Sequence, residues 1–344
     1  MDSNSQIGSP RRVLIVKPSA LGDVVTGIPV LRGLRRTFGP SLQIDWLVGR
    51  PYAELLEAQG ELSAVVPFDR HGYAHMAYNP LAAAAFVRFC RQLRRARYDW
   101  VIDLQGLFRS GFLTSVTGAP VRAGFAASRE GAALFYTHVL PLEKTPLHSV
   151  DRNIALANML GVDARPGDYG LTIAAEHRRW AEGFAAAELG RPFVLIAPAA
   201  RWVTKLYPAH HWRAVVEHLR SRVAIVLVAG GREKHLTAPL AGEGIVDLAG
   251  RTLLGQLAAL ASLARAVVCG DSGVMHIAAA VGAPTISLIG PTDPARTGPY
   301  GQMDRIIRTA VRCRGCLKRR CRHRACMESI SPSSVLAAVE RCIA

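Results

Sequence analysis

The sequence predicts an α/β protein with two doubly wound parallel sheets, one in each half of the chain. Short apolar runs recur along both halves, and many of their residues are β-branched, as in strands buried on both faces of a parallel sheet. Most runs are followed by glycine or proline and then by apolar residues at helical spacing. Residues 161–171 lack periodicity and have the composition of a linker. We therefore expect a first domain over 1–165 and a second over 172–344.

Composition and charge limit the classes of partner. The chain of 344 residues has 42 lysines and arginines against 26 aspartates and glutamates, and the resulting charge of +16 favours an anionic partner. Nucleic acid, an anionic membrane surface and a phosphorylated small molecule all fit that charge. The sequence shows no signal-peptide pattern, and no run approaches the ~20 apolar residues of a membrane span. We therefore expect a cytoplasmic protein.

The first element is the apolar run 13–16 (VLIV), which we expect to be a buried strand. Proline and serine end the strand, and Gly22 gives the backbone freedom for a tight turn into a helix over 24–37. Ligands of open α/β sheets bind at the carboxyl ends of the strands, where this turn places Asp23. The Asp23 carboxylate would either act on a substrate or cap the helix, and this stretch alone favours neither alternative.

The rest of the first half alternates between strand and helix. Strands are expected at 43–48, 64–67, 100–104 and 121–124, and helices at 52–59, 80–97 and 149–160. Residues 69–79 form a polar loop, whose histidines lack metal-ligand spacing. The helix over 80–97 ends in a row of arginines, which either offsets the helix dipole on a solvated face or contacts anionic headgroups. The solvated face is the simpler interpretation.

The second half repeats this alternation. Strands are expected at 193–197, 223–229, 266–269 and 285–289, and helices at 176–188, 252–264, 277–281 and 331–343, with a further helix around Trp212. Two strand-and-helix halves, each with a loop-rich edge, imply a cleft between them.

The turn after the strand at 266–269 has the features of a phosphate cradle. It has the sequence GDSG and leads into a helix, whose unpaired N–H groups and dipole favour an anion. The pattern is neither G-x-G-x-x-G nor a P-loop, which disfavours dinucleotide dehydrogenases and P-loop ATPases. We expect phosphates on the amides of Ser272 and Gly273, with the Asp271 carboxylate facing a sugar hydroxyl or capping the helix. His276 lies about one turn further on, where it either reaches the same anion or faces the core.

Four motifs follow one another along most of the chain. They are KPSALGD (17–23), DLQGLFRSG (103–111), ARWVTKLYPAHHW (200–212) and GDSGVMHIAAAVGAPTISLIGPT (270–292). Together they resemble glycosyltransferase family 9, the bacterial lipopolysaccharide heptosyltransferases, and are most similar to the type I enzymes. Each motif alone is weak, but four in this order are specific.

The resemblance implies a GT-B fold, in which two Rossmann-like domains face each other across a cleft. The first domain would bind the acceptor and the second the nucleotide-sugar. Similar enzymes transfer heptose from ADP-L-glycero-D-manno-heptose to the Kdo–lipid A inner core, with inversion and without a metal, at the inner face of the cytoplasmic membrane. No cofactor and no nucleic-acid partner are expected. In GT-B proteins the last helix tends to cross back onto the first domain, which we expect for 331–343.

The resemblance also implies roles for single residues. Asp23 would be the general base that takes a proton from the attacking sugar hydroxyl, and Lys205 would offset the charge of the departing ADP. Glu233 would bond the ribose hydroxyls, and Arg129 would hold the anionic acceptor. The implied donor site comprises Thr204, Lys205, Glu233, Asp271, Ser272, Gly273 and His276. The implied acceptor site comprises Ser19, Gly22, Arg70 and Arg129.

Four cysteines lie close together in a basic stretch near the end of the sequence: Cys313, Cys316, Cys321 and Cys326. Either they hold a structural zinc ion, or they form a loop of thiols or disulfides. Only Cys313 and Cys316 have C-x-x-C spacing, so the second alternative is favoured and no metal is assigned.

Two kinds of rival interpretation remain. A nucleotide-sugar epimerase, or another GT-B transferase with a different donor, would share the fold. A protein from another class, a non-catalytic basic protein that binds zinc and nucleic acid, would use the cationic cysteine stretch. The last alternative is disfavoured because it leaves the polar edges of both sheets without a role.

Overall fold

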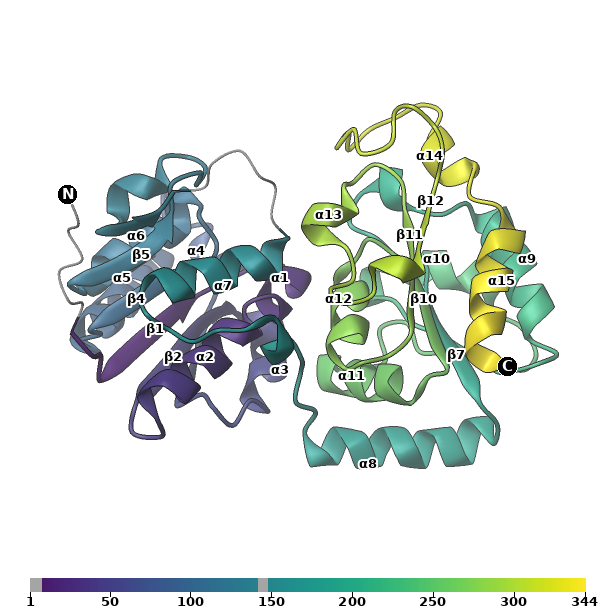
Figure 1. Ribbon diagram of the computed structural model, residues 1–344, viewed down its shortest axis with the longest axis horizontal. Helices are drawn as coiled ribbons and strands as arrows, with labels where there is room; N and C mark the ends of the chain where they lie inside the picture. Colours follow the sequence, from purple (N-terminus) through teal and green to yellow (C-terminus); the bar gives the residue numbers. More distant parts are fainter. Residues whose placement is uncertain (1–7, 142–147) are drawn as a thin grey trace. The chain divides into compact units, whose positions relative to one another are not determined.

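The computed structural model describes residues 8–141 and 148–344. The chain folds into two compact units, Met1–Tyr169 and Gly170–Ala344, and the division falls within residues 161–171. Each unit contains one six-stranded parallel sheet with helices packed on its faces (Figure 1). The predicted α/β class is confirmed.

The sheet of the first unit has the strand order β3-β2-β1-β4-β5-β6. The strands are β1 (Arg12–Val16), β2 (Gln43–Gly49), β3 (Ala64–Phe68), β4 (Trp100–Asp103), β5 (Val121–Phe125) and β6 (His138–Leu140). Strand β1 pairs in register with β2 and β4, so that Val13 lies between Ile44 and Trp100. Because the chain winds outward in both directions from β1, the carboxyl ends of β1 and β4 form the topological switch point, where ligands of such sheets bind.

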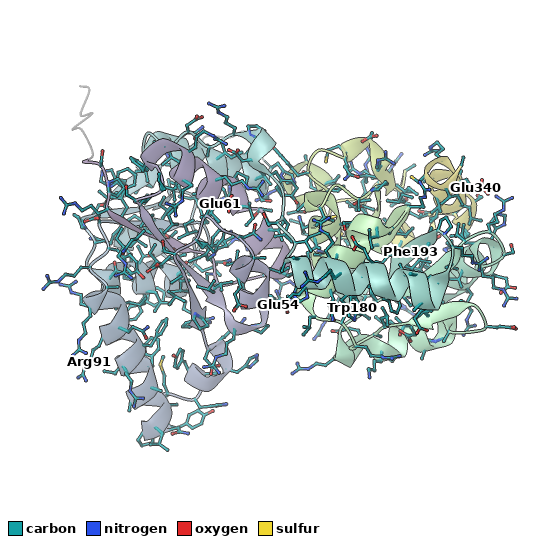
Figure 2. All side chains as sticks on the ribbon, turned by 90° about the horizontal axis from the view of Figure 1, so that it is seen from below. Glu54, Glu61, Arg91, Trp180, Phe193 and Glu340 are labelled. Carbon is teal, nitrogen blue, oxygen red and sulfur yellow. The ribbon has the colours of Figure 1, made fainter. Side chains whose placement is uncertain are left out.

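Helices of the first unit connect these strands. They are α1 (Leu21–Val25), α2 (Ile28–Phe38), α3 (Ala53–Glu57), α4 (Arg70–Tyr73), α5 (Pro80–Arg95), α6 (Phe108–Thr117) and α7 (Ser149–Met159). On one face of the sheet, Leu14 and Val16 are fully buried against side chains that include Phe89 and Leu93 of α5. The arginines at the end of α5 are solvent-exposed, and Figure 2 shows Arg91 projecting outward from this helix.

The helix expected over 24–37 is two helices, and the reason is a proline. Pro29 lies in the first turn of α2. Its missing N–H costs no hydrogen bond there, because N–H groups of the first turn have no acceptor within the helix. Inside a continuous helix its ring would clash with the carbonyl four residues earlier. Gly27 begins α2, and a Cβ there would lie 2.8 Å from the ring of Trp46, so the break also lets the chain approach the sheet closely.

Further differences from the sequence prediction are local. The polar loop 69–79 contains α4, because the Asp69 carboxylate accepts a hydrogen bond from the N–H of Gly72 and caps a single helical turn. Helix α6 was not predicted, because its apolar residues follow no clear stripe. The edge strands β6, β9 and β12 were missed as well, since three residues each are too few for a pattern.

The sheet of the second unit has the order β12-β11-β10-β7-β8-β9. The strands are β7 (Phe193–Ala197), β8 (Ala224–Leu227), β9 (Ile245–Asp247), β10 (Ala266–Gly270), β11 (Thr285–Ile289) and β12 (Ile306–Arg308). Here the switch point lies between β7 and β10, which pair in parallel with Val267 opposite Leu195. The loops that follow these two strands therefore mark the expected ligand edge.

The helices of the second unit are α8 (Ala175–Phe184), α9 (Ala209–Leu219), α10 (Lys234–Thr237), α11 (Leu254–Leu263), α12 (Gly273–Ala280), α13 (Pro294–Thr297), α14 (Ala325–Glu328) and α15 (Pro332–Ile343). Helix α8 continues into a π-helical turn, and its Trp180 stacks on Phe184 at 5.5 Å between ring centroids (Figure 2). No helix among the described residues is both long and apolar enough to cross a bilayer.

The buried face of the last helix, α15, belongs to the core of the second unit. Its Val335 and Val339 are fully buried beside Val215 of α9 and Val268 of β10. A contact of 331–343 with the first domain stays a prediction. The amphipathic pattern of the helix predicted a buried face without saying which surface would cover it.

Candidate active site in two half-sites

The Asp23 carboxylate lies at the switch point of the first unit. It is in the first turn of α1, directly after β1, and its Oδ2 accepts a hydrogen bond of 2.8 Å from the backbone N–H of Ala20. Ala20 is the N-cap residue of α1, so Asp23 occupies the third helical position and the prediction of a capping Asp is only partly right. The side chain is partly exposed, and its Oδ1 has no hydrogen-bond partner among the described residues. This oxygen is therefore available to an incoming hydroxyl.

Lys17 lies near enough to this carboxylate for the two charges to interact, and it was not predicted as a site residue. Its side chain is buried, and its ammonium donates a hydrogen bond to the carbonyl of Leu104. Burial lowers the pKa of Lys17, while the nearby carboxylates of Asp23 and Asp103 raise it in part. A lysine that directly follows four buried apolar residues of a strand was the available signal, because such a position is normally inside.

A second buried carboxylate fixes the neighbouring turn. Asp103, at the end of β4, is fully buried, and it accepts hydrogen bonds from the Tyr136 hydroxyl at 2.7 Å and the Gln105 N–H at 2.8 Å. Burial raises the pKa of Asp103, and these donors oppose the rise. The Gln105 side chain in turn accepts the N–H of Ser19 at 3.1 Å, so the turns after β1 and β4 are tied together. The tie holds the Asp23 turn in place.

The predicted acceptor residues occupy several places in the first unit. Ser19 lies in the turn before α1, and Gly22 is buried within α1. Arg129 is exposed after β5, and its backbone N–H bonds the carbonyl of Gly106, which brings it beside the turn after β4. Arg70 begins α4 and is exposed.

Arg109, on α6, is a neighbour of Arg70 that was not predicted as a site residue. Burial lowers the pKa of Arg109, the charge of Arg70 lowers it further, and the nearby Glu130 carboxylate raises it in part. Two guanidinium groups that repel each other in this way form a local cationic surface, which suits an anionic ligand.

The second half-site centres on an ion pair between Lys205 and Asp271. The Lys205 ammonium donates to Asp271 Oδ2 at 2.8 Å, and the Thr292 hydroxyl donates to the same oxygen at 2.6 Å. The two charged side chains are 13% and 8% exposed. The pair joins the loops after β7, β10 and β11 at the switch point of this sheet.

The position of Asp271 corrects one alternative from the sequence. It does not cap α12, because Ser272 is the N-cap residue and the Asp271 carboxylate is bonded to Lys205 and Thr292. Helix α12 begins at Gly273, four residues earlier than expected, so the amides of Ser272 and Gly273 stand at its positive end. Ser272 Oγ is buried and has no hydrogen-bond partner among the described residues, so this hydroxyl can bond a phosphate oxygen.

The remaining predicted donor residues follow the same edge. His276 is buried in the first turn of α12. Glu233 lies after β8 in a short turn, and its side chain folds over Gly230 so closely that a Cβ there would lie 2.4 Å from the carboxylate. Thr204 is buried, and its hydroxyl donates to the carbonyl of Lys318 at 2.8 Å. The Thr204 hydroxyl therefore serves a contact within the protein.

The four cysteines of the basic stretch lie in one neighbourhood. Cys313, Cys316 and Cys321 are exposed, Cys326 on α14 is buried, and all four are free thiols, so the disulfide alternative is not borne out. Burial raises the pKa of Cys326, and the three other thiols raise it further. Among the described residues no three of them bring their sulfurs within 4.8 Å of one another, and the zinc alternative stays a prediction.

Another group of metal-ligating side chains does come together. His210 and His211 at the start of α9 and Glu328 on α14 each place one ligand atom within 4.8 Å of the others. This group was not predicted from the sequence, because Glu328 lies far along the chain from the two adjacent histidines. The Glu328 carboxylate also lies 3.7 Å from the Arg324 guanidinium, so it already has a cationic partner, and we assign no metal there.

The fold and the two half-sites define a GT-B glycosyltransferase. One doubly wound unit carries a carboxylate at its switch point, and the other carries a lysine and a helix N-terminus suited to a phosphate. The chain belongs to glycosyltransferase family 9 (heptosyltransferase), whose family model matches residues 86–326. The predicted family and enzyme class are confirmed.

Similar proteins cover nearly the whole chain. The lipopolysaccharide heptosyltransferase 1 of Pseudomonas aeruginosa is 33% identical over 322 residues, which cover 90% of this chain and 87% of that protein. The Escherichia coli K12 protein of the same name is 30% identical, and the alignment covers 86% of this chain and 93% of that protein. The structure of E. coli heptosyltransferase WaaC with ADP-2-deoxy-2-fluoro heptose aligns with a TM-score of 0.75 at 26% identity, over 96% of this chain and 99% of that chain.

Proposed function

We propose that this protein transfers L-glycero-D-manno-heptose from the ADP-sugar to the Kdo–lipid A inner core of lipopolysaccharide, with inversion at the anomeric carbon and without a metal ion. The observation that carries the proposal is the half-site of the second unit, where a lysine and an open helix N-terminus meet at the switch point. The similarity to lipopolysaccharide heptosyltransferases supports the choice of heptose and of a lipid A acceptor.

The proposed reaction is a single displacement. Asp23 takes the proton of the acceptor hydroxyl as the acceptor oxygen forms its bond to the anomeric carbon. The bond from that carbon to the diphosphate oxygen breaks at the same time, and ADP leaves from the opposite face, which inverts the configuration. Lys205 and the amides of Ser272 and Gly273 offset the charge that develops on ADP. The remaining donor residues, Glu233 and His276, would hold the sugar nucleotide.

We further propose that the first unit works at the inner face of the cytoplasmic membrane. Tyr78 is 75% exposed, Leu81 81% and Leu134 89%, and the elements around them, α4, α5, α6 and the turn containing Leu134, are in contact with one another. Exposed apolar side chains on neighbouring elements are typical of an interaction surface. The arginine row of α5 and the pair Arg70 and Arg109 would add attraction to anionic lipid.

A direct assay tests the transferase proposal. The purified protein is incubated with ADP-heptose and Kdo–lipid A, with and without a chelator, and the product is analysed by mass spectrometry and by NMR of its anomeric configuration. We expect one added heptose, an inverted anomeric centre and no effect of the chelator. Turnover of ADP-heptose without an acceptor would instead indicate an epimerase, and transfer only from another nucleotide-sugar would contradict the proposed donor.

A further inference from the structure

The segment between β12 and α14, residues 309–324, is docked on the ligand edge of the second sheet; we call it the cysteine-rich loop. Its Gly315 N–H bonds the carbonyl of Gly290 at 3.0 Å, and its Leu317 N–H bonds that of Pro291 at 2.7 Å. On the other side its Lys318 carbonyl accepts the hydroxyl of Thr204. These partners follow β11 and β7, which flank β10, so the loop is attached on both sides of the Asp271 turn.

This docking brings one guanidinium to the half-site. Arg319 Cζ lies 4.9 Å from the ring centroid of Trp202, and Lys205 Nζ lies 4.5 Å from the same centroid. The two cations are therefore no further apart than the sum of these distances. A guanidinium on an aromatic face is held in position while its N–H edge stays open to another partner. Arg319 itself is exposed, and the described residues provide no carboxylate that pairs with it.

The net charge of the half-site indicates why a further cation is needed there. The Lys205 charge is compensated by the Asp271 carboxylate at 2.8 Å, so the pair as a whole is neutral. A diphosphate bears two or more negative charges, and in the absence of other cations it would meet only backbone amides and a neutral pair. Arg319 restores a net positive charge at this place, and a guanidinium can form two parallel hydrogen bonds to one phosphate.

We propose that Arg319, presented on Trp202 by the cysteine-rich loop, is a binding residue for the diphosphate of the donor. The ligand class is a nucleoside diphosphate or its sugar ester. The inference rests on the proposed function in one respect, namely that the second unit binds the donor. It gives the cysteine-rich loop and Trp202 a part in donor binding. Neither was predicted from the sequence to have one.

The experiment measures binding of two probes, ADP and inorganic pyrophosphate, by isothermal titration calorimetry of the full-length protein at fixed ionic strength. Arg319→Ala is expected to weaken ADP about tenfold, as for one charge-assisted hydrogen-bonding group at a partly exposed site. The ADP affinity of Arg319→Lys should lie between those of the unaltered protein and of Arg319→Ala. Lysine keeps the positive charge but lacks the paired N–H donors of the guanidinium. The binding of adenosine, which lacks the diphosphate, should stay unchanged.

The matched control is Arg320→Ala. Arg320 is the next residue, it is also exposed, and among the described residues it forms no cation–π contact with Trp202. Arg320→Ala removes the same positive charge as Arg319→Ala. An equal loss of ADP affinity in both variants would therefore show that only the net charge of the loop matters, and it would overturn the proposal. Unchanged ADP affinity in Arg319→Ala would overturn it as well.

The pyrophosphate probe separates this proposal from the proposed function. If the unaltered protein binds pyrophosphate but not ADP, the choice of an adenine nucleotide is wrong, while Arg319 is still tested by the pyrophosphate affinity of its variants. If the protein binds ADP and Arg319→Ala binds it equally well, the donor class stands and only the role of Arg319 fails. Trp202→Leu should weaken ADP at least as much as Arg319→Ala, because it removes the ring on which both the Arg319 guanidinium and the Lys205 ammonium lie.

Discussion

Replacing Lys205 by methionine should affect both the stability of the second unit and its affinity for ADP. The replacement leaves the Asp271 carboxylate, 8% exposed, with the Thr292 hydroxyl as its remaining side-chain partner among the described residues. Removing one member of a buried ion pair costs about 3–5 kcal/mol, and since these side chains keep slight solvent contact we expect about 2–4 kcal/mol. Loss of activity in Lys205→Met would therefore not by itself show that Lys205 contacts the diphosphate.

A second substitution separates the two effects. In the double variant Lys205→Met with Asp271→Asn, the uncompensated charge is gone, and the amide still accepts the Thr292 hydroxyl. We expect its free energy of unfolding to return to within about 1 kcal/mol of the unaltered protein. ADP affinity should remain about tenfold or more below normal, because the ammonium that can donate hydrogen bonds to the diphosphate is still missing.

The assay combines urea unfolding, followed by tryptophan fluorescence, with calorimetric titration of ADP. Each of the four proteins in the double-mutant cycle is measured at the same pH and salt concentration, since the ion pair is part of a charged site. Two results would refute the reasoning. One is a Lys205→Met variant as stable as the unaltered protein, and the other is a double variant that regains normal ADP affinity.

Three further predictions concern the first unit. Asp23→Asn should lower the turnover number by about 10²–10⁴, as for loss of a general base, with ADP affinity unchanged; a steady-state assay with near-normal turnover would remove Asp23 from that role. Because the pKa of buried Lys17 is lowered on folding, its ammonium is protonated in the unfolded chain and deprotonated in the folded one between the folded pKa and the ordinary value of 10.5, so the contribution of Lys17 to stability should rise with pH in that interval. Lys17→Met should abolish this rise, and urea unfolding at several pH values that showed the same slope in both proteins would contradict the cause. Leu81→Asp, at a side chain that is 81% exposed, should weaken sedimentation with anionic vesicles several-fold without changing the melting temperature, whereas Leu253→Asp in the second unit, 55% exposed, is the control that should bind vesicles normally.

The parts of the fold that could be predicted are those determined by residues close together in the sequence. The run 13–16 is apolar without interruption and is followed by a glycine turn, so both the strand and the placing of Asp23 beyond its end could be inferred. The GDSG turn likewise predicted a helix N-terminus with free amides. The break between α1 and α2 was also locally encoded, in Pro29, and was overlooked.

The contacts between distant side chains were beyond such patterns. Lys205 and Asp271 are 66 residues apart in the chain, and only the pairing of β7 with β10 brings their loops together. From the sequence, Asp271 was expected to face a sugar or to cap a helix. That expectation considered only the residues next to Asp271 in the chain, so it did not include the Lys205 ammonium, which another loop supplies. Arg319 was hidden in the same way, as one of several arginines in a stretch without periodicity. Its docking on Trp202 depends on backbone hydrogen bonds to the loop after β11 and on a hydrogen bond from the Thr204 hydroxyl in the loop after β7.

The position of α15 has a consequence for genetics. Its Val335 and Val339 complete the same apolar core as the central strand β10, although they follow every half-site residue in the sequence. A premature stop codon just upstream of Pro332 would spare every residue assigned to either half-site and still expose that core to water. Nonsense alleles of this kind should therefore behave as null alleles because the protein is degraded, and a missing catalytic group would not be the cause.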